Sequence, residues 1–247
     1  MDSPGYIILS RLTLQSRATQ VLAHNVANAD TPGYRALRPV FAAHLERQDA
    51  AAAPPGGRDV HFVADRATWR DMETGAMQVT GNPLDAAITG EGFFAVETPR
   101  GERFTRAGRF SLGEGGRIVD MEGHPVLGEG GLPIAVAPND SRIEIQGDGT
   151  VRSENGVIGR LRVVRFENPQ GLLAEGDRLF DAAAEAALPV ERPALRQGVL
   201  EGSNVRPVAE MTRLTTELRE FQFAAQFAER EGERLSTAVE RILRRRT

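Results

Sequence analysis

The sequence contains no cysteine, which excludes disulfide bonds, thiolate metal sites and thiol nucleophiles. It also contains no lysine, so Schiff-base chemistry and a phosphate loop ending in Gly-Lys are excluded. Basic and acidic residues nearly balance at a formal net charge of −4, which gives no overall field that would gather nucleic acid. No apolar run approaches the roughly 18–20 residues that a membrane-spanning helix needs. We therefore expect no nucleic-acid partner and no membrane insertion.

Enzymatic motifs are also missing. The sequence has no HExxH motif, no Gly-x-Ser-x-Gly elbow and no complete GxGxxG loop. Asp120 and Glu122 form a possible acid–base pair, but a solvated strand edge is the favoured interpretation. We expect a protein that is not an enzyme, with no metal, no cofactor and no small-molecule substrate. The histidines are His24, His44, His61 and His124, and none of them has a second histidine four residues away.

The C-terminal segment has the clearest periodicity. Its apolar residues recur at alternating steps of three and four, which predicts a helix with a heptad seam. Pro207 suits the first turn, so the predicted helix runs from Pro207 to Arg244, about 57 Å at 1.5 Å per residue. Ser203 or Asn204 is expected near its cap. The seam comprises Met211, Leu214, Leu218, Phe221, Ala225, Ala228, Gly232, Leu235, Val239 and Ile242, with Phe223 and Phe227 lying off it.

The N-terminal segment predicts a second helix that ends near Ala29. Two stripes of apolar residues on different sides indicate two packing partners, or one partner plus the chain's own other end. Pro32-Gly33 suits the centre of a type II turn. Asn25 and Asn28 fit either a role in fixing helix register or a role in helix termination, with equal weight. The first stripe is Ile8, Leu12, Gln15, Thr19, Leu22 and Val26, and the second is Ile7, Leu14, Ala18, Val21 and Asn25.

The two helices are expected to meet, with part of their apolar surface left for another subunit. Seven large seam residues would contribute roughly 10–20 kcal/mol if fully buried. An N-terminal helix about a third shorter cannot cover the whole seam, although it could cover the Phe223 and Phe227 patch. The predicted assembly interface is Ile8, Leu12, Leu22, Asn25, Val26, Asn28, Met211, Leu214, Leu218, Phe221, Phe223, Phe227, Leu235, Val239 and Ile242.

Between the helices, short strand-like runs alternate with turn residues, which predicts a central antiparallel all-β domain. The runs are residues 93–97, 103–110, 118–121, 133–137, 143–146 and 157–166. Gly147-Asp148-Gly149 and Asn155-Gly156 are the strongest hairpin signals. The predicted fold is mixed α and β, with long terminal helices forming a coiled-coil-like layer. The expected segments are 1–34 helical, 35–81 linker or extended, 82–180 central β-domain, 181–205 return linker and 206–247 C-terminal helix, with an Ala/Pro-rich linker at 48–58.

Three groups of motifs resemble one known family. Residues 25–34, Asn-Val-Ala-Asn-Ala-Asp-Thr-Pro-Gly-Tyr, are similar to the signature that closes the N-terminal helix of flagellar rod and hook proteins. Residues 198–205, Gly-Val-Leu-Glu-Gly-Ser-Asn-Val, resemble the signature before the C-terminal helix. Residues 88–96, 104–110 and 120–128 resemble core motifs of the family's β-domain. The chain is thereby identified as a member of the flagellar basal-body rod family. Its signature-turn residues are Thr31, Pro32, Gly33, Tyr34, Glu201, Ser203, Asn204 and Val205.

This resemblance implies a structural subunit whose paired terminal helices line a tube. Its length and its Thr-Pro-Gly-Tyr turn fit the proximal rod better than the hook, with the distal rod as the alternative. The family resemblance also implies export through the flagellar type III apparatus without a cleavable signal peptide, into the periplasmic rod. The implied partners are other rod proteins, copies of itself and the export apparatus. A different hypothesis is a glycan-binding β-domain whose helices only oligomerise it.

Overall fold

The computed structural model describes residues 3–47, 59–183 and 185–244, so the expected linker at 48–58 lies outside it. The chain divides into two compact units. One comprises Met1–Ala27, Leu37–Arg70 and Arg206–Thr247, and we call it the helical unit. The other comprises Asn28–Ala36 and Asp71–Val205, and we call it the β-unit. The chain therefore passes from one unit to the other four times.

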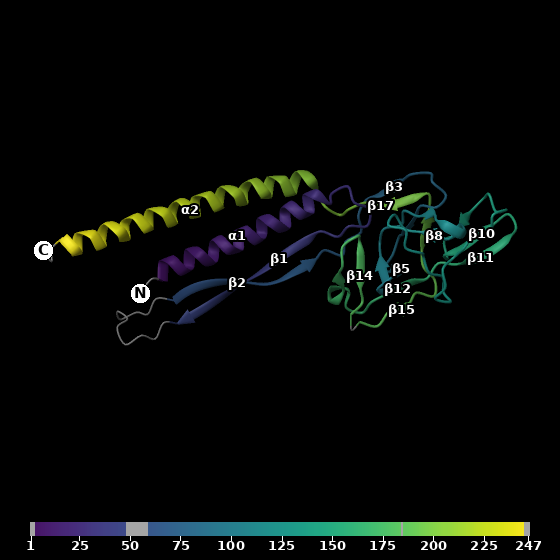
Figure 1. The fold of residues 1–247 in the computed structure, drawn as a ribbon, viewed down its shortest axis with the longest axis horizontal. Helices are drawn as coiled ribbons and strands as arrows, with labels where there is room; N and C mark the ends of the chain where they lie inside the picture. Colours follow the sequence, from purple (N-terminus) through teal and green to yellow (C-terminus); the bar gives the residue numbers. More distant parts are fainter. Residues whose placement is uncertain (1–2, 48–58, 184, 245–247) are drawn as a thin grey trace. The chain divides into compact units, whose positions relative to one another are not determined.

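The helical unit contains the two helices α1 (Ser3–Ala27) and α2 (Pro207–Arg244). The bounds predicted for the C-terminal helix are confirmed, whereas the N-terminal helix ends two residues before the expected Ala29. α1 packs against α2 and also against an antiparallel ribbon of β1 (Leu37–Arg47) and β2 (Asp59–Arg70), as Figure 1 shows. No helix in the described ranges has an apolar stretch that would cross a membrane.

The two apolar stripes of α1 are explained by these two partners. Leu14, Ala18 and Val21 from one stripe and Leu22 from the other are all buried. A helix that contacts α2 and the ribbon needs apolar character on both sides, so the expectation of two partners is confirmed. The ribbon lies where a linker or extended region was expected. Its eleven residue pairs each join one residue of β1 to one residue of β2, so neither strand can be recognised from its own segment alone.

The β-unit is built on a six-stranded antiparallel sheet of order β13-β14-β6-β5-β12-β15. Smaller sheets pair β11-β10-β9, β16-β4, β17-β3 and β7-β8. The strands are β3 (Met77–Val79), β4 (Ala86–Ile88), β5 (Phe93–Thr98), β6 (Gly101–Thr105), β7 (Ser111–Leu112), β8 (Ile118–Val119), β9 (Glu144–Ile145), β10 (Thr150–Ser153), β11 (Gly156–Arg160), β12 (Val163–Arg165), β13 (Leu173–Ala174), β14 (Leu179–Asp181), β15 (Leu188–Pro189), β16 (Leu195–Gln197) and β17 (Val199–Glu201).

Both faces of the six-stranded sheet are covered, which explains the unbroken apolar run at the start of β5. Phe94 and Val96 point into the larger core of the unit. Phe93 and Ala95 point to the opposite face, into a smaller cluster of aromatic residues. In that cluster the ring of Phe93 packs edge-on against the rings of two other phenylalanines at 5.7 Å. Alternating residues therefore all meet apolar neighbours.

The observed strands follow the expected ones only in part. The predicted strand at Phe93 matches β5, and both hairpin turns are confirmed between β9 and β10 and between β10 and β11. The run 157–166 is divided between β11 and β12, and residues 133–137 form only isolated bridges. Residues 181–205, expected as a return linker, contribute β15, β16 and β17 to sheets of the β-unit.

Candidate functional site: a buried ion triad between signature segments

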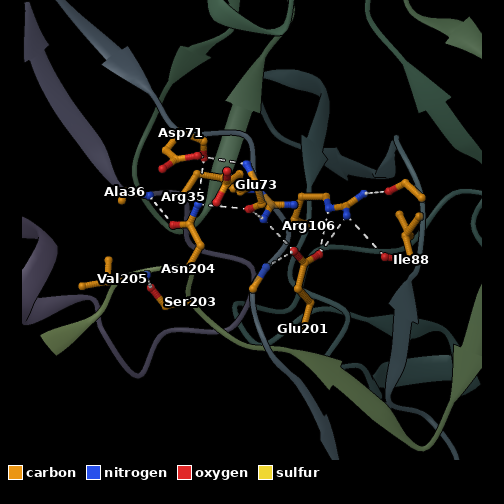
Figure 2. A network of polar contacts seen from close by, with 12 residues as sticks. Arg35, Ala36, Asp71, Glu73, Ile88, Arg106, Glu201, Ser203, Asn204 and Val205 are labelled. Carbon is orange, nitrogen blue, oxygen red and sulfur yellow. Dashed lines mark hydrogen bonds and ion pairs between the residues drawn. The ribbon is translucent and has the colours of Figure 1, made fainter.

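Three charged side chains from distant parts of the chain meet inside the β-unit. Glu201 ends β17, and its carboxylate is completely buried. Its Oε1 lies 2.7 Å from Nη1 of Arg35, and its Oε2 lies 2.9 Å from Nη2 of Arg106. Figure 2 shows the carboxylate facing both guanidinium groups. We call Arg35, Glu201 and Arg106 the ion triad.

Arg106 is held by backbone carbonyls as well as by Glu201. Its Nη1 donates to the carbonyls of Gly90 and Gly92 at 2.9 and 2.5 Å, and its Nη2 donates to Ile88 at 3.3 Å. Burial lowers the pKa of Arg106, the Glu201 carboxylate opposes this shift, and the Arg35 charge adds to it. The guanidinium thus ties β4, the loop before β5 and β17 together.

Arg35 is less completely satisfied than Arg106. Its Nη1 donates to the carbonyl of Glu73 as well as to Glu201, while its buried Nε has no hydrogen-bond partner. The backbone N–H of Gly75 donates to the same Glu201 oxygen at 3.1 Å. The carboxylate therefore joins the segment before β3 to the segment after α1.

The first signature turn is anchored on this site. The N–H of Tyr34 donates to the Thr31 carbonyl at 3.2 Å, and Gly33 has a φ of +70°, which confirms the expected turn. The N–H of Gly33 also donates to the backbone carbonyl of Glu201 at 2.8 Å. A Cβ on Gly33 would lie 2.6 Å from the backbone carbon of Arg106, so this position requires glycine.

Substituting Gly33→Ala is expected to destabilise the β-unit by about 1–3 kcal/mol, because alanine is strained at this φ and clashes with the Arg106 backbone. Urea unfolding of the full chain measures the change. Gly130→Ala is the matched control, because Gly130 has open space around it. Equal unfolding curves for the two variants would contradict the prediction.

The second signature is anchored by Asn204. Its Oδ1 accepts the Ala36 N–H at 2.7 Å, and its Nδ2 donates to the carbonyls of Asp71 and Glu73 at 2.9 and 3.0 Å. Ser203 Oγ accepts the N–H of Val205. Ser203 and Asn204 thus lie close to the start of the C-terminal helix at Pro207, as expected, but their side chains bond within the β-unit.

A related polar cluster lies inside the helical unit. Asn25 on α1 is fully buried, and its amide exchanges two hydrogen bonds with the backbone of Leu37, at 2.8 and 2.9 Å. Its Nδ2 also lies 3.5 Å from Oε2 of the buried Glu210 on α2. Glu210 pairs with Arg38 at 2.5 Å and with Arg213 at 3.2 Å. Asn25 therefore fixes the start of β1 beside both helices. Of the two roles expected for this residue, this agrees better with fixing helix register than with helix termination.

Asn25→Ala is expected to cost about 1–3 kcal/mol of helical-unit stability, because the N–H and carbonyl of Leu37 lose their partner. Hydrogen exchange should accelerate in α1 and β1 more than in the β-unit. The exposed Gln20→Ala on the same helix is the control. Unchanged protection of Leu37 would disprove this role.

The predicted interface residues divide by their exposure. In the N-terminal segment, two of these residues are buried in the chain's own fold, namely Leu22 and Asn25. Four others are partly covered: Ile8, Leu12, Val26 and Asn28. On α2, Leu214 and Phe221 are half-buried, on the side of the helix that carries Glu210. Exposed positions are Met211, Leu218, Phe223 and Phe227, while the side chains of Leu235, Val239 and Ile242 lie outside the described part.

Glu217 lies half-buried on α2, and burial raises its pKa, with further repulsion from Glu220. A raised carboxyl pKa means that the neutral form is favoured in the folded state, so helical-unit stability should increase as pH falls through that pKa. Glu217→Gln should therefore protect α2 against proteolysis at pH 7 and weaken this pH dependence. The exposed Glu233→Gln is the control, and an unaltered pH dependence in Glu217→Gln would contradict the assignment.

Sequence reasoning named Glu201 only as a turn residue and gave Arg35 and Arg106 no role. A usable signal exists for Arg106, because it lies two residues after the buried Phe104 and so continues the face of β6 that carries that ring. A charge in register with a buried aromatic residue requires a buried partner. Among the residues that the structure describes, no cluster of three or more metal-ligating side chains occurs.

Known protein families match all three segments that supply the ion triad. A model described as flagella basal body rod protein matches residues 6–35, which include Arg35. The flagellar hook protein FlgE/F/G D1 domain matches residues 87–153, which include Arg106. The flagellar basal body rod FlgEFG protein C-terminal model matches residues 196–241, which include Glu201. These matches define the class as axial proteins of the bacterial flagellum.

Individual relatives cover nearly the whole chain. The flagellar basal-body rod protein FlgF of Caulobacter vibrioides is 35% identical over 98% of each chain. FlgF of Salmonella typhimurium is 35% identical over 90% of this chain and 91% of its own length. FlgG of Agrobacterium fabrum is 31% identical over 87% of this chain and 90% of its own length. The chain belongs to the flagellar basal-body rod protein family and is a FlgF-like rod protein.

Proposed function

We propose that this protein is a structural subunit of the proximal rod and that it polymerises through the outer face of α2. The observation that carries the proposal is the exposure of large apolar side chains along that helix. Leu218, Phe227 and Phe223 expose 43, 59 and 70% of their surface. These residues lie on two sides of the outer face, with Leu218 and Phe227 about 180° apart around the helix at 100° per residue. Such side chains lose contact with water when neighbouring helices pack on them.

The seam of α2 supports a coiled-coil-like layer in the assembled rod. The half-buried residues of the seam pack within the helical unit of the same chain, and the exposed residues of the seam remain available for contact with another subunit. A strict seventh-residue repeat drifts about 20° per heptad on a straight helix, so a single partner does not cover the whole seam. Met211 and Leu218 lie at its exposed margin. We propose that α-helices of neighbouring subunits cover this margin.

Parts of both signatures lie in the β-unit, next to the places where the chain changes units. Residues 33–36, 71–75 and 201–205 all adjoin places where the chain changes units, and hydrogen bonds of Asn204 and Glu201 join them. This arrangement supports the proposal that the signature turns connect the terminal helices to the β-unit and that the β-unit sets subunit spacing. Export through the flagellar type III apparatus and a periplasmic location are parts of the same proposal.

The distal-rod alternative rests on the FlgG relatives, whose identities of 30–31% are lower than the 35% of several FlgF relatives. The glycan-binding alternative has less support, because the lone tryptophan, Trp69, lies on β2 of the helical unit. Antibody labelling of the protein in purified basal bodies separates these possibilities. Label at the base of the rod supports the proposal, and label at the distal end or only on the cell wall contradicts it.

A further inference from the structure

A cleft of about 260 Å³ lies beside the ion triad in the β-unit. Both arginines of the triad line it, and Arg165, an exposed residue, lines it from β12. Figure 2 shows the Arg106 guanidinium reaching along this part of the unit toward the strand that ends at Ile88. Phe93 and Phe166 supply apolar walls. The cleft thus combines three arginines, two of them buried, with two exposed glutamates, Glu91 and Glu167, and apolar walls.

The buried charges beside this cleft do not balance. Two guanidinium groups, 2 and 3% exposed, face the single carboxylate of Glu201, which leaves one positive charge in excess. Glu201 is the only carboxylate in ion-pair range of either group among the described residues. The Nε of Arg35 has no hydrogen-bond partner. Because an uncompensated buried charge is costly, a carboxylate from outside would complement this site.

The dimensions and lining of the cleft narrow the choice of anion. Small-molecule sites usually measure about 300–1,000 Å³, so this cleft suits one side chain better than a cofactor. Phe93 and Phe166 are buried and offer apolar contact to methylene groups. Glu91 and Glu167 also line the cleft, and they repel a doubly charged phosphate more than a single carboxylate. The N–H groups of Arg106 are already bonded, so the exposed guanidinium of Arg165 is the one that can match the planar shape of a carboxylate.

We propose that the cleft binds the side chain of a glutamate that a neighbouring rod subunit presents. The proposal rests on the proposed function, because the rod is what brings a neighbour to this surface. The carboxylate meets the excess charge of the arginines, and the two methylene groups of the glutamate pack on the side of the cleft that Phe93 and Phe166 line together. An Asp side chain is one methylene shorter and fits less deeply.

A titration of the full-length protein followed by amide NMR tests the chemistry. The probe is N-acetylglutamic acid α-amide, whose only charge is the side-chain carboxylate, and N-acetylglutamine amide is its neutral match. We expect saturable shifts at Gly90 and Gly92 with the acid, at a dissociation constant on the order of 1 mM, and none with the neutral probe. Equal shifts with both probes, or tighter binding of inorganic phosphate, would overturn the proposal.

Two pairs of variants locate the binding. Gly90→Trp places an indole in the cleft and Gly130→Trp is its control, because a Cβ added to either glycine would meet no atom within 4 Å and neither φ is positive. Arg165→Glu reverses a charge of the cleft, and the exposed Arg152→Glu reverses one elsewhere in the β-unit. Gly90→Trp and Arg165→Glu should weaken probe binding at least tenfold, whereas the controls should not change it.

Incorporation of the variants into rods in cells tests whether a neighbouring rod subunit supplies the glutamate. Gly90→Trp should lower incorporation into purified rods, while Gly130→Trp should not. Normal incorporation of Gly90→Trp would overturn the role of a neighbouring glutamate and leave the rod function intact. Absence of the unmodified protein from rods would instead overturn the proposed function, and probe binding would then still report on the cleft.

Discussion

Replacing Glu201 with leucine is expected to cost about 3–5 kcal/mol of β-unit stability, the largest effect of any single substitution that we foresee. The substitution leaves Arg35 and Arg106 buried side by side without a counter-charge. It also removes the acceptor of the Gly75 N–H. Glu201→Gln should cost less, because the amide oxygen keeps one acceptor for these donors, although the charge is lost.

Urea unfolding and hydrogen exchange of the full-length chain measure this cost. The loss of protection should be largest at Gly33 and Gly75 and in the paired strands β3 and β17, because these segments bond to Glu201 or to its strand. Glu97→Gln, at an exposed position on β5, serves as the control. A Glu201→Leu protein as stable as this control would show that the ion triad contributes nothing to the fold.

Introducing aspartate at Leu218 or Phe227 is expected to abolish incorporation into the rod while leaving both units folded. The two side chains are exposed in the free chain, so a charge there stays in contact with water and costs little. In the polymer the same charge would be buried against apolar neighbours, at a cost of several kcal/mol. Because every subunit carries the change, the penalty recurs at each contact.

Motility in soft agar and labelling of purified basal bodies measure incorporation, and circular dichroism checks that helix content is retained. Leu218→Met and Phe227→Leu are matched controls that keep the surface apolar and should support assembly. Normal rods with either aspartate variant would rule out the outer face of α2 as a polymer contact. Loss of helix content would instead assign the defect to folding.

The two helices could be predicted from the sequence because the patterns that indicate them lie within short, continuous segments. Pro207 fixes the first turn of α2. Apolar residues follow one another at steps of three and four as far as Ile242, and this spacing fits a helix but not a strand, in which alternate residues share a face. At the other end, a Thr-Pro-Gly sequence stops the N-terminal helix within two residues of the expected position. Hairpins at residues 147–149 and 155–156 follow from glycines whose φ is positive, at Gly149 and Gly156.

The ribbon of β1 and β2 and the strands β16 and β17 could not be predicted from the sequence in the same way. β1 and β2 surround residues 48–58, and nothing in either segment alone specifies the other as its partner. β16 and β17 pair with β4 and β3, more than a hundred residues earlier in the chain. Pairing over such separations is decided by the packing of the whole unit, so composition indicated linkers where the chain forms strands.

Taken by itself, the sequence determined the two helices, the bounds of the C-terminal one, the β-rich centre and the family, since periodicity, turn chemistry and motifs are properties of short segments. Only the tertiary structure decided that Arg35, Arg106 and Glu201 form one buried group and that Asn25 holds Leu37 rather than a helix end. It also decided which apolar residues of α2 remain exposed. The physical reason is that charge pairing and burial depend on contacts between residues far apart in sequence, which no local pattern specifies.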